Sequence, residues 1–177
     1  MPDLHFRFKS LQESDLPVLV AWLSRNHLQE WWRAEEITLE KIREKYLPRI
    51  FDKDSAKPFL VYLRKEPFGY IQYYWAAEGD TNWWPDQPDA DAIGIDQFIS
   101  DESKLNQGYG TAMITQFIHF LMNSIKISEI RVDPRPNNYR AIRCYEKIGF
   151  IQCGNIKTPD GPATMMILKT ETFNLKK

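Results

Sequence analysis

The sequence predicts an α/β protein with one mixed sheet of about six or seven strands, flanked by about four helices. Three observations lead to this fold class. A length of 177 residues suits one domain spanning residues 1–177. Strand and helix patterns alternate along the chain, without an internal repeat, linker or low-complexity tract. Hydrophobic residues make up 43% and charged residues 27%, which is ordinary for a globular protein.

The N-terminal elements follow from residue alternation and from helix-start signals. Apolar and polar residues alternate over residues 4–8, which predicts a first strand. Ser14 or Asp15 is a typical N-cap, and Pro17 suits a first helical turn. These signals predict a helix that runs to about Arg25.

A second helix and a hairpin are expected next. The helix should open at Thr38 and end before Pro48, because proline has no amide hydrogen for the helical ladder. Residues 59–63 and 68–75 are rich in β-branched and aromatic side chains, which predicts two strands joined by a short turn. Residues 78–91 are rich in Gly, Pro and Asp, which predicts a long loop. Such loops are often functional, and this one carries Trp83 and Trp84.

The second half of the chain continues the alternation. Gly149 is a suitable residue to end the last of its helices. We expect strands at 92–100, 129–132, 150–155 and 164–168, and helices at 110–123 and 138–148.

Composition excludes several classes of protein. A net charge of -1 argues against a nucleic-acid binder that neutralises phosphates. No apolar run approaches the roughly 18 residues of a membrane span, and the N-terminus lacks the features of a signal peptide. Two cysteines, Cys144 and Cys153, suit free thiols in a reducing cytoplasm. Three scattered histidines offer no ligand spacing, so we expect no metal site.

Charge is distributed unevenly along the chain. No Lys or Arg occurs between Ala76 and Ser103, where the acidic residues are Glu78, Asp80, Asp86, Asp89, Asp91, Asp96, Asp101 and Glu102. The basic residues downstream include Lys104, Arg131, Arg135, Arg140, Arg143 and Lys147. The pattern suits an enzyme that joins a cationic substrate to an anionic cofactor, although solvated surface explains any single residue equally well.

A glycine-containing turn lies between an expected strand and an expected helix. Its residues are Gln107, Gly108, Tyr109, Gly110 and Thr111. Glycines allow a sharp turn, and the first amides of a helix, together with its dipole, attract anions. The segment is therefore a candidate phosphate-binding loop, although an ordinary turn has the same spacing.

The next helix carries a second group of residues. Asn138, Ala141 and Tyr145 lie on one helical face, where a small side chain permits close approach and the two polar ones can bind a ligand. An ordinary amphipathic helix explains Ala141 and Tyr145, but leaves Asn138 unexplained. Cys144 lies beside Tyr145, about 100° around the helix and off this face.

With these two motifs the chain resembles the GNAT acetyltransferases. Gly108 and Gly110 match the family's pyrophosphate loop, while Leu105 stands where the family usually has Arg or Gln. The helix containing Asn138 and Tyr145, followed by Gly149 and a phenylalanine, matches the second half of the cofactor site. The resemblance implies the GNAT fold and acetyl-CoA as cosubstrate, bound by segment 107–111 together with Asn138, Ala141 and Tyr145.

A closer resemblance is to the aminoglycoside 6'-N-acetyltransferases. It is carried, in order along the chain, by AWLSR at 21–25, EWW at 30–32, KYLP at 45–48, GY at 69–70, WW at 83–84, GIDQ at 94–97, DP at 133–134, RAIRCYEK at 140–147 and TPDGP at 158–162. It implies a reaction in which acetyl moves from acetyl-CoA to a primary amine of a polycationic drug, which gives antibiotic resistance.

The same resemblance implies catalytic roles. Asp96 matches the acid that orients or deprotonates the amine, and Tyr145 matches the acid that protonates the departing thiolate. Backbone amides near Gln97 and Phe98 are candidates to stabilise the oxyanion. We favour direct attack in a ternary complex over an acyl-enzyme, since no histidine partners Cys144, the obvious nucleophile.

Substrate-binding roles follow in the same way. Thr81 stands where that family has a further acid, and Asp80 beside it is the candidate replacement. The expected substrate-binding residues are Trp31, Asp80, Trp83, Asp96, Asp133 and Asp160.

Two alternatives remain open at this stage. A GNAT enzyme could act on another small polyamine or on a siderophore-precursor amine, with the same fold and cosubstrate. A non-catalytic acyl-CoA-binding module is the alternative from another class, and the presence of both Asp96 and Tyr145 argues against it. We expect a cytoplasmic monomer or homodimer whose partner is a cationic small molecule.

Overall fold

A computed structural model describes residues 4–32, 36–78 and 83–174. It contains a mixed seven-stranded sheet with the strand order β1-β2-β3-β4-β5-β7-β6. The strands are β1 (Phe6–Ser10), β2 (Lys57–Leu63), β3 (Glu66–Trp75), β4 (Ile93–Ile99), β5 (Glu129–Val132), β6 (Ile151–Thr158) and β7 (Gly161–Lys169). The α-helices in the described residues are α1 (Leu16–Leu23), α2 (Asn26–Gln29), α3 (Leu39–Ile50), α4 (Tyr109–Met122), α5 (Tyr139–Ile148) and α6 (Thr170–Asn174).

The chain packs as two compact units, which we describe separately. Unit 1 comprises residues 1–72 and 97–105, and unit 2 comprises residues 73–96 and 106–177. The α/β class and the mixed sheet confirm the expected fold, whereas the single-domain organisation stays a prediction. The short helices α2 and α6 were not expected from the sequence.

The start of α1 in unit 1 has the expected N-cap residue but is preceded by a turn that was not expected. A 3-10 turn, Glu13–Asp15, precedes the helix and has Gln12 as its N-cap, while Asp15 is the N-cap of α1, as predicted. The Asp15 carboxylate accepts the Gln12 backbone amide at 2.9 Å, which satisfies a donor at the entry to the helix. Pro17 lies in the first turn of α1, as predicted.

The end of α3 corrects a boundary. Thr38 is the N-cap, as predicted, and its hydroxyl accepts the Lys41 amide at 3.2 Å. The helix nevertheless continues through Pro48 to Ile50. Pro48 stands in the last turn, where its missing amide removes a single helical bond, and Phe51 still donates to Leu47 O at 3.0 Å.

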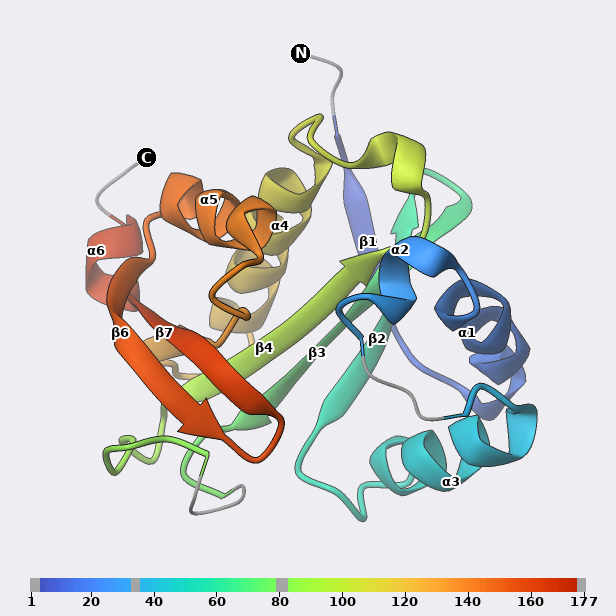
Figure 1. Cartoon of the computed structure of the whole chain (residues 1–177), viewed down its shortest axis with the longest axis horizontal. Helices are drawn as coiled ribbons and strands as arrows, with labels where there is room; N and C mark the ends of the chain where they lie inside the picture. The colour runs from blue at the N-terminus through green and yellow to red at the C-terminus, as the bar shows by residue number, and fades with distance from the viewer. Residues whose placement is uncertain (1–3, 33–35, 79–82, 175–177) are drawn as a thin grey trace. The chain divides into compact units, whose positions relative to one another are not determined.

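A cluster of aromatic side chains lies within the core of unit 1. The Tyr70 ring stacks on Phe98 at 5.4 Å between centroids, and Tyr46 and Trp32 meet Tyr70 edge-on at 5.6 and 5.7 Å. Helices α1 and α3 lie side by side over this cluster (Figure 1). A Cβ on Gly69 would lie 2.4 Å from Phe98 O, so glycine permits the close approach of β3 to β4 here.

Unit 2 holds α4 and α5 side by side (Figure 1). The buried face of α4 has helical spacing, with Met113, Ile114, Phe117, Ile118 and Leu121. All four residues of β5 are buried, and its observed bounds equal the predicted ones. Gly149 ends α5 at a φ of 120°, and its amide donates to Tyr145 O at 3.1 Å.

The hairpin of β2 and β3 is confirmed, with strands longer than predicted and a turn at Arg64, whose φ is 60°. Among the described residues, no helix is both long and apolar enough to cross a membrane.

Candidate active site

The glycine turn before α4 has the geometry expected of an anion-binding loop. Gly108 is the N-cap of α4, with a φ of 85° that disfavours any other residue. The amide of Ala112 donates to Gly108 O at 3.0 Å, which makes the first bond of the helix. In a helix the amides before that bond have no partner within the helix, so those of Gly110 and Thr111 suit an anion. No side chain caps this helix end, which leaves the turn suited to a diphosphate.

Helix α5 lies against the same turn. The Thr111 hydroxyl and the Cys144 sulfur are 3.5 Å apart, so Cys144 lies against the first turn of α4. That Cys144 lies off the helical face of Asn138 and Tyr145 stays a prediction. Burial raises the pKa of the Cys144 thiol, while Thr111 and the charge of Lys147 oppose the shift. A thiol held neutral in this way is a poor nucleophile.

Asn138 has a local role that the sequence did not show. Its side-chain oxygen accepts the Ala141 amide at 3.2 Å and caps α5. The cap explains an asparagine at this position, so its role in binding acetyl-CoA stays a prediction. Tyr145 is buried, and its ring lies 5.3 Å from that of Phe150.

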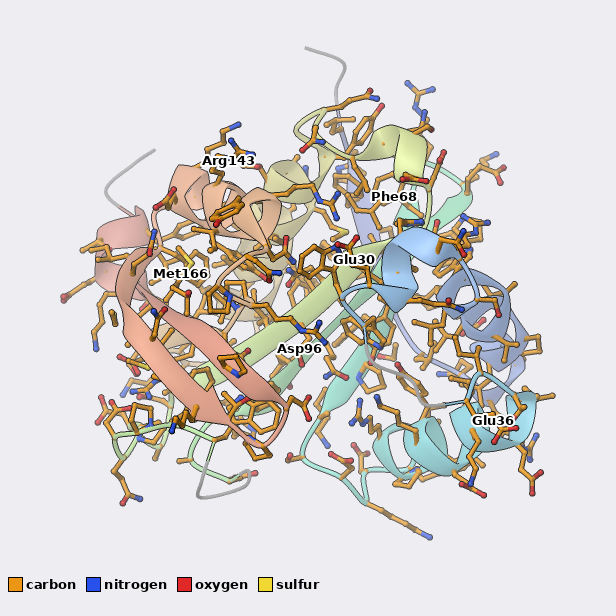
Figure 2. The ribbon with its side chains drawn as sticks, in the orientation of Figure 1. Glu30, Glu36, Phe68, Asp96, Arg143 and Met166 are labelled. Carbon is orange, nitrogen blue, oxygen red and sulfur yellow. The ribbon has the colours of Figure 1, made fainter. Side chains whose placement is uncertain are left out.

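The candidate acid Asp96 lies on β4, and Asp133 directly follows the neighbouring strand β5. Strands β4 and β5 are parallel, and Gly94 pairs with Arg131. Asp96 lies two residues beyond Gly94, and Asp133 lies two residues beyond Arg131. Equal offsets along parallel strands place both side chains on the same face of the sheet. Figure 2 labels Asp96 on β4, which crosses the centre of the picture.

A tyrosine that the sequence did not single out joins this group. A Cβ on Gly94 would lie 2.1 Å from Tyr74 Cζ and 2.4 Å from its hydroxyl, so glycine makes room for the phenol. Burial, and then the negative charges of Asp96 and Asp133, raise the pKa of Tyr74 well above 10. Its hydroxyl therefore stays protonated beside the acids. Tyr74 lies in a run of aromatic residues, and strand alternation gave no reason to select it.

The pKa of the Asp133 carboxyl lies far above its ordinary value. Burial, and then the negative charge of Asp96, raise its pKa from 3.8 to about 8, although the hydrogen bond from Trp83 lowers it. Trp83 Nε1 donates to Asp133 Oδ2 at 3.0 Å. The two acids therefore titrate as a coupled pair, which holds a proton near neutral pH.

This raised pKa predicts how stability depends on pH. Near pH 6 the Asp133 carboxyl is protonated in the folded protein and ionised in the unfolded chain, so unfolding releases a proton. Its contribution to the free energy of unfolding is therefore present below its unfolded pKa of 3.8 and is lost as pH rises to about 8. We expect Asp133→Asn to flatten the decline of stability with pH in urea titrations between pH 5 and 9. Replacement of the exposed Glu40 by Gln is the control and should leave the change of stability with pH as in wild type. If Asp133→Asn also leaves that change unaltered, the raised pKa does not belong to Asp133.

The other expected substrate residues lie in different places. Trp31 is half-buried at the end of α2 in unit 1. Asp160 is exposed on the β6–β7 turn, and its charge contributes to the raised pKa of Asp133. Asp80 and Thr81 lie outside the described residues. Gln97 and Phe98 follow Asp96 along β4, and the Phe98 ring is part of the unit 1 core.

One basic residue is not available to a cofactor. Arg131 was counted among the cations downstream of the acidic segment, but it is buried in β5 and paired with Glu129 and Asp86. Within residues 4–32, 36–78 and 83–174, no cluster of His, Cys, Asp and Glu side chains could hold a metal ion. The arrangement in unit 2 therefore combines an anion-binding helix start with an acid pair that suits an amine.

Comparison with known proteins places this arrangement in a family. The model of the acetyltransferase (GNAT) domain matches residues 12–158. The aminoglycoside N(6')-acetyltransferase type 1 of Klebsiella pneumoniae is 41% identical over 165 residues, covering 92% of this chain and 82% of that protein. The crystal structure of an aminoglycoside acetyltransferase, AAC(6')-Ib, with coenzyme A and kanamycin has a TM-score of 0.89 at 38% identity and covers 97% of this chain and 98% of that one. The same enzyme with coenzyme A alone has a TM-score of 0.90 at 38% identity, with the same coverage.

Proposed function

Since the chain belongs to the GNAT acetyltransferases and, within them, to the aminoglycoside 6'-N-acetyltransferases, we propose that it transfers acetyl from acetyl-CoA to the 6'-amino group of an aminoglycoside. Acetylation removes a positive charge from the drug and thereby gives antibiotic resistance. The observation that carries this proposal is the coupled acid pair Asp96 and Asp133 in the unit that also carries the glycine turn. The glycine turn suits the anionic cosubstrate, and the acid pair suits the cationic amine.

The acid pair supplies two functions that an amine acceptor needs. An alkyl ammonium has a pKa near 10.4 and no lone pair, so it has to be bound and then deprotonated. A base is most effective when its pKa is near the working pH. The raised pKa of Asp133, about 8, meets that condition better than an ordinary aspartate does. Asp96 holds the ammonium, and the coupled pair takes the proton directly or through water.

The transfer step follows from these positions. The amine nitrogen bonds to the acetyl carbon, the carbon–sulfur bond breaks, and the ammonium proton goes to the acid pair. Amides near Gln97 and Phe98 stabilise the oxygen that becomes negative during attack. Tyr145 gives its phenolic proton to the departing thiolate, whose pKa is near 8.5 by analogy with cysteine, so this donation is helpful rather than essential. Alignment of the two reactants accounts for much of the rate.

Aromatic and acidic groups around the pair suit a polycationic sugar. Trp83 is half-buried, and its indole nitrogen donates to Asp133. Indole faces bind cations and stack on sugar rings. Trp31, Asp80 and Asp160 are proposed to contact more distant rings of the drug.

Cys144 is not an acetyl carrier in this proposal. We expect Cys144→Ala to keep kcat and KM within about twofold of wild type, since a thiol with a raised pKa is a poor nucleophile. Steady-state thiol release measures this, and mass spectrometry of the wild type after a single turnover checks for an acetyl adduct. Lost turnover in the variant, together with an acetylated Cys144 in the wild type, would show a covalent route.

The function is tested by thiol release from acetyl-CoA with kanamycin, tobramycin, amikacin and gentamicin, with spermidine as the polyamine control. We expect turnover with aminoglycosides that carry a 6'-amine, and NMR of the product should place the acetyl group on that nitrogen. Turnover confined to spermidine would favour a polyamine enzyme. Tight acetyl-CoA binding without turnover on any amine would identify a binding module.

We further propose a cytoplasmic location and a monomeric or homodimeric state. The location is supported by the two free cysteines, Cys144 and Cys153, which suit a reducing compartment. Analytical ultracentrifugation gives the oligomeric state.

A further inference from the structure

The paired tryptophans of unit 2 differ sharply in burial. Trp84 is 6% exposed and packs with Ala76, Ala92 and Met165, so it anchors the described residues 83–86, which precede β4. Trp83 is half-buried and donates to the carboxylate of Asp133. One ring therefore fixes the segment, while the other contacts an acid of the proposed site.

A buried arginine connects this segment to the sheet. The Arg131 guanidinium lies 5.4 Å from the centroid of the Trp84 ring. Its two terminal nitrogens donate to the two oxygens of Asp86 at 2.6 and 2.8 Å, and its Nε donates to Glu129 at 2.6 Å. The side chain is 3% exposed. We call Arg131, Asp86 and Trp84 the clamp.

Bidentate pairing gives the clamp its geometric effect. A guanidinium facing a carboxylate through two parallel hydrogen bonds fixes orientation as well as distance. Asp86 lies two residues after Trp84, and Arg131 lies two residues before Asp133 on the chain. The clamp therefore fixes the tryptophan pair relative to the end of β5, where Trp83 meets Asp133.

The clamp stands apart from the proposed chemistry. Arg131 pairs with Asp86 and with Glu129, and Glu129 also contacts Lys169. No residue of the clamp belongs to the acid pair or to α5. The Arg131 guanidinium also lowers the pKa of Asp86, so that carboxyl stays charged at neutral pH. Half of the Asp86 side chain, 51%, is nevertheless exposed, so a change there does not open a cavity in the core.

We propose that Arg131, through Asp86 and Trp84, is a positioning residue that sets the placement of Trp83 on Asp133 and thereby the affinity for the aminoglycoside. This inference rests on the proposed function. Asp96 and Tyr145 lie outside the clamp, and Asp133 is linked to it only through Trp83, so loss of the clamp should change substrate binding more than the rate of the bound complex.

The test uses Asp86→Ala and a matched control. Asp91→Ala removes the same charge from the same segment, where Asp91 pairs with the exposed Lys126 at 3.1 Å and takes no part in the clamp. We expect Asp86→Ala to raise KM for kanamycin roughly tenfold, because the segment loses a charge-assisted bidentate contact. Its KM for acetyl-CoA should stay within about twofold, and any fall in kcat should be smaller than the rise in KM for kanamycin, as expected when substrate binding is lost more than chemistry. Asp91→Ala should match wild type.

Two further variants separate positioning from general stability. Asp86→Glu keeps the carboxylate and should recover most of the kanamycin affinity. Arg131→Lys keeps the charge but loses the two-nitrogen fork, so it should raise KM for kanamycin as Asp86→Ala does. An unchanged KM in Asp86→Ala overturns the proposal. A parallel fall of kcat, acetyl-CoA affinity and Tm also overturns it, because that pattern indicates a purely structural role.

A readout without substrate distinguishes failure of the clamp from failure of the proposed function. In Asp86→Ala, but not in Asp91→Ala, acrylamide should quench tryptophan fluorescence more strongly than in wild type. The increase should disappear when Trp83 is replaced by Phe. If wild type acetylates no aminoglycoside, the proposed function fails while this measurement still tests the clamp, and equal quenching in all variants overturns the clamp itself.

Discussion

Asp96→Asn is expected to lower kcat for kanamycin by roughly 10²- to 10⁴-fold, the range that general acid–base groups contribute. Asparagine has nearly the same shape but neither binds an ammonium as a charge partner nor accepts its proton. The substitution also removes the negative charge that helps to raise the pKa of Asp133, so the coupled pair loses both of its functions.

Acetyl-CoA binding separates this effect from misfolding. The glycine turn before α4 binds the cosubstrate through backbone amides and does not include Asp96, so the Kd of the variant for acetyl-CoA should stay within about twofold of wild type by calorimetry. Asp89→Asn, an exposed acid of the same acidic segment, serves as the control and should keep full activity. An equal loss of acetyl-CoA affinity and turnover in a folded Asp96→Asn protein would indicate a structural role for Asp96.

Gly94→Ala should lower both the stability and the activity of the protein, with the second largest effect of the substitutions considered. The added methyl group would overlap the Tyr74 ring, at 2.1 Å from its Cζ, on a strand whose backbone is held by β5. Overpacking of this kind costs about 1–3 kcal/mol of stability. Since the ring shares its surroundings with Asp96 and Asp133, its displacement should also lower kcat/KM for kanamycin.

A double variant tests whether overlap with the Tyr74 ring causes the loss of stability in Gly94→Ala. In a Tyr74→Ala background the overlapping atoms are gone, so adding Gly94→Ala should cost little further stability in urea titrations. The two substitutions should therefore be strongly non-additive, as expected of residues in contact. Additive losses, or a Gly94→Ala protein as stable as wild type, would contradict the contact between Gly94 and Tyr74.

Much of the fold could be predicted because local patterns and tertiary packing agree. Strand β5 matches its prediction residue for residue, and Thr38 and Gly149 limit their helices where cap chemistry places them. Errors arose where packing outweighs a local signal. Helix α3 continues past Pro48, and a 3-10 turn that begins after Gln12 precedes α1.

The candidate site could be predicted only in part. Gly108 was recognisable because a left-handed glycine before a helix has a sequence signature. Tyr74 and the clamp were not, since their importance comes from contacts across strands that no spacing reveals. In the sequence Arg131 is one of several basic residues, and only the structure shows that it is buried and forms ion pairs with Asp86 and Glu129. Asn138 had a local explanation, the cap of α5, that sequence alone did not distinguish from ligand binding.

A crystal structure of the protein with coenzyme A and kanamycin tests the central claim most directly. The account predicts diphosphate oxygens within hydrogen-bonding distance of the amides at Gly110 and Thr111. It also predicts the drug's 6'-nitrogen against Asp96, with Asp133 as the second carboxylate. A diphosphate bound elsewhere, together with an Asp96 side chain that faces no part of the drug, would contradict it.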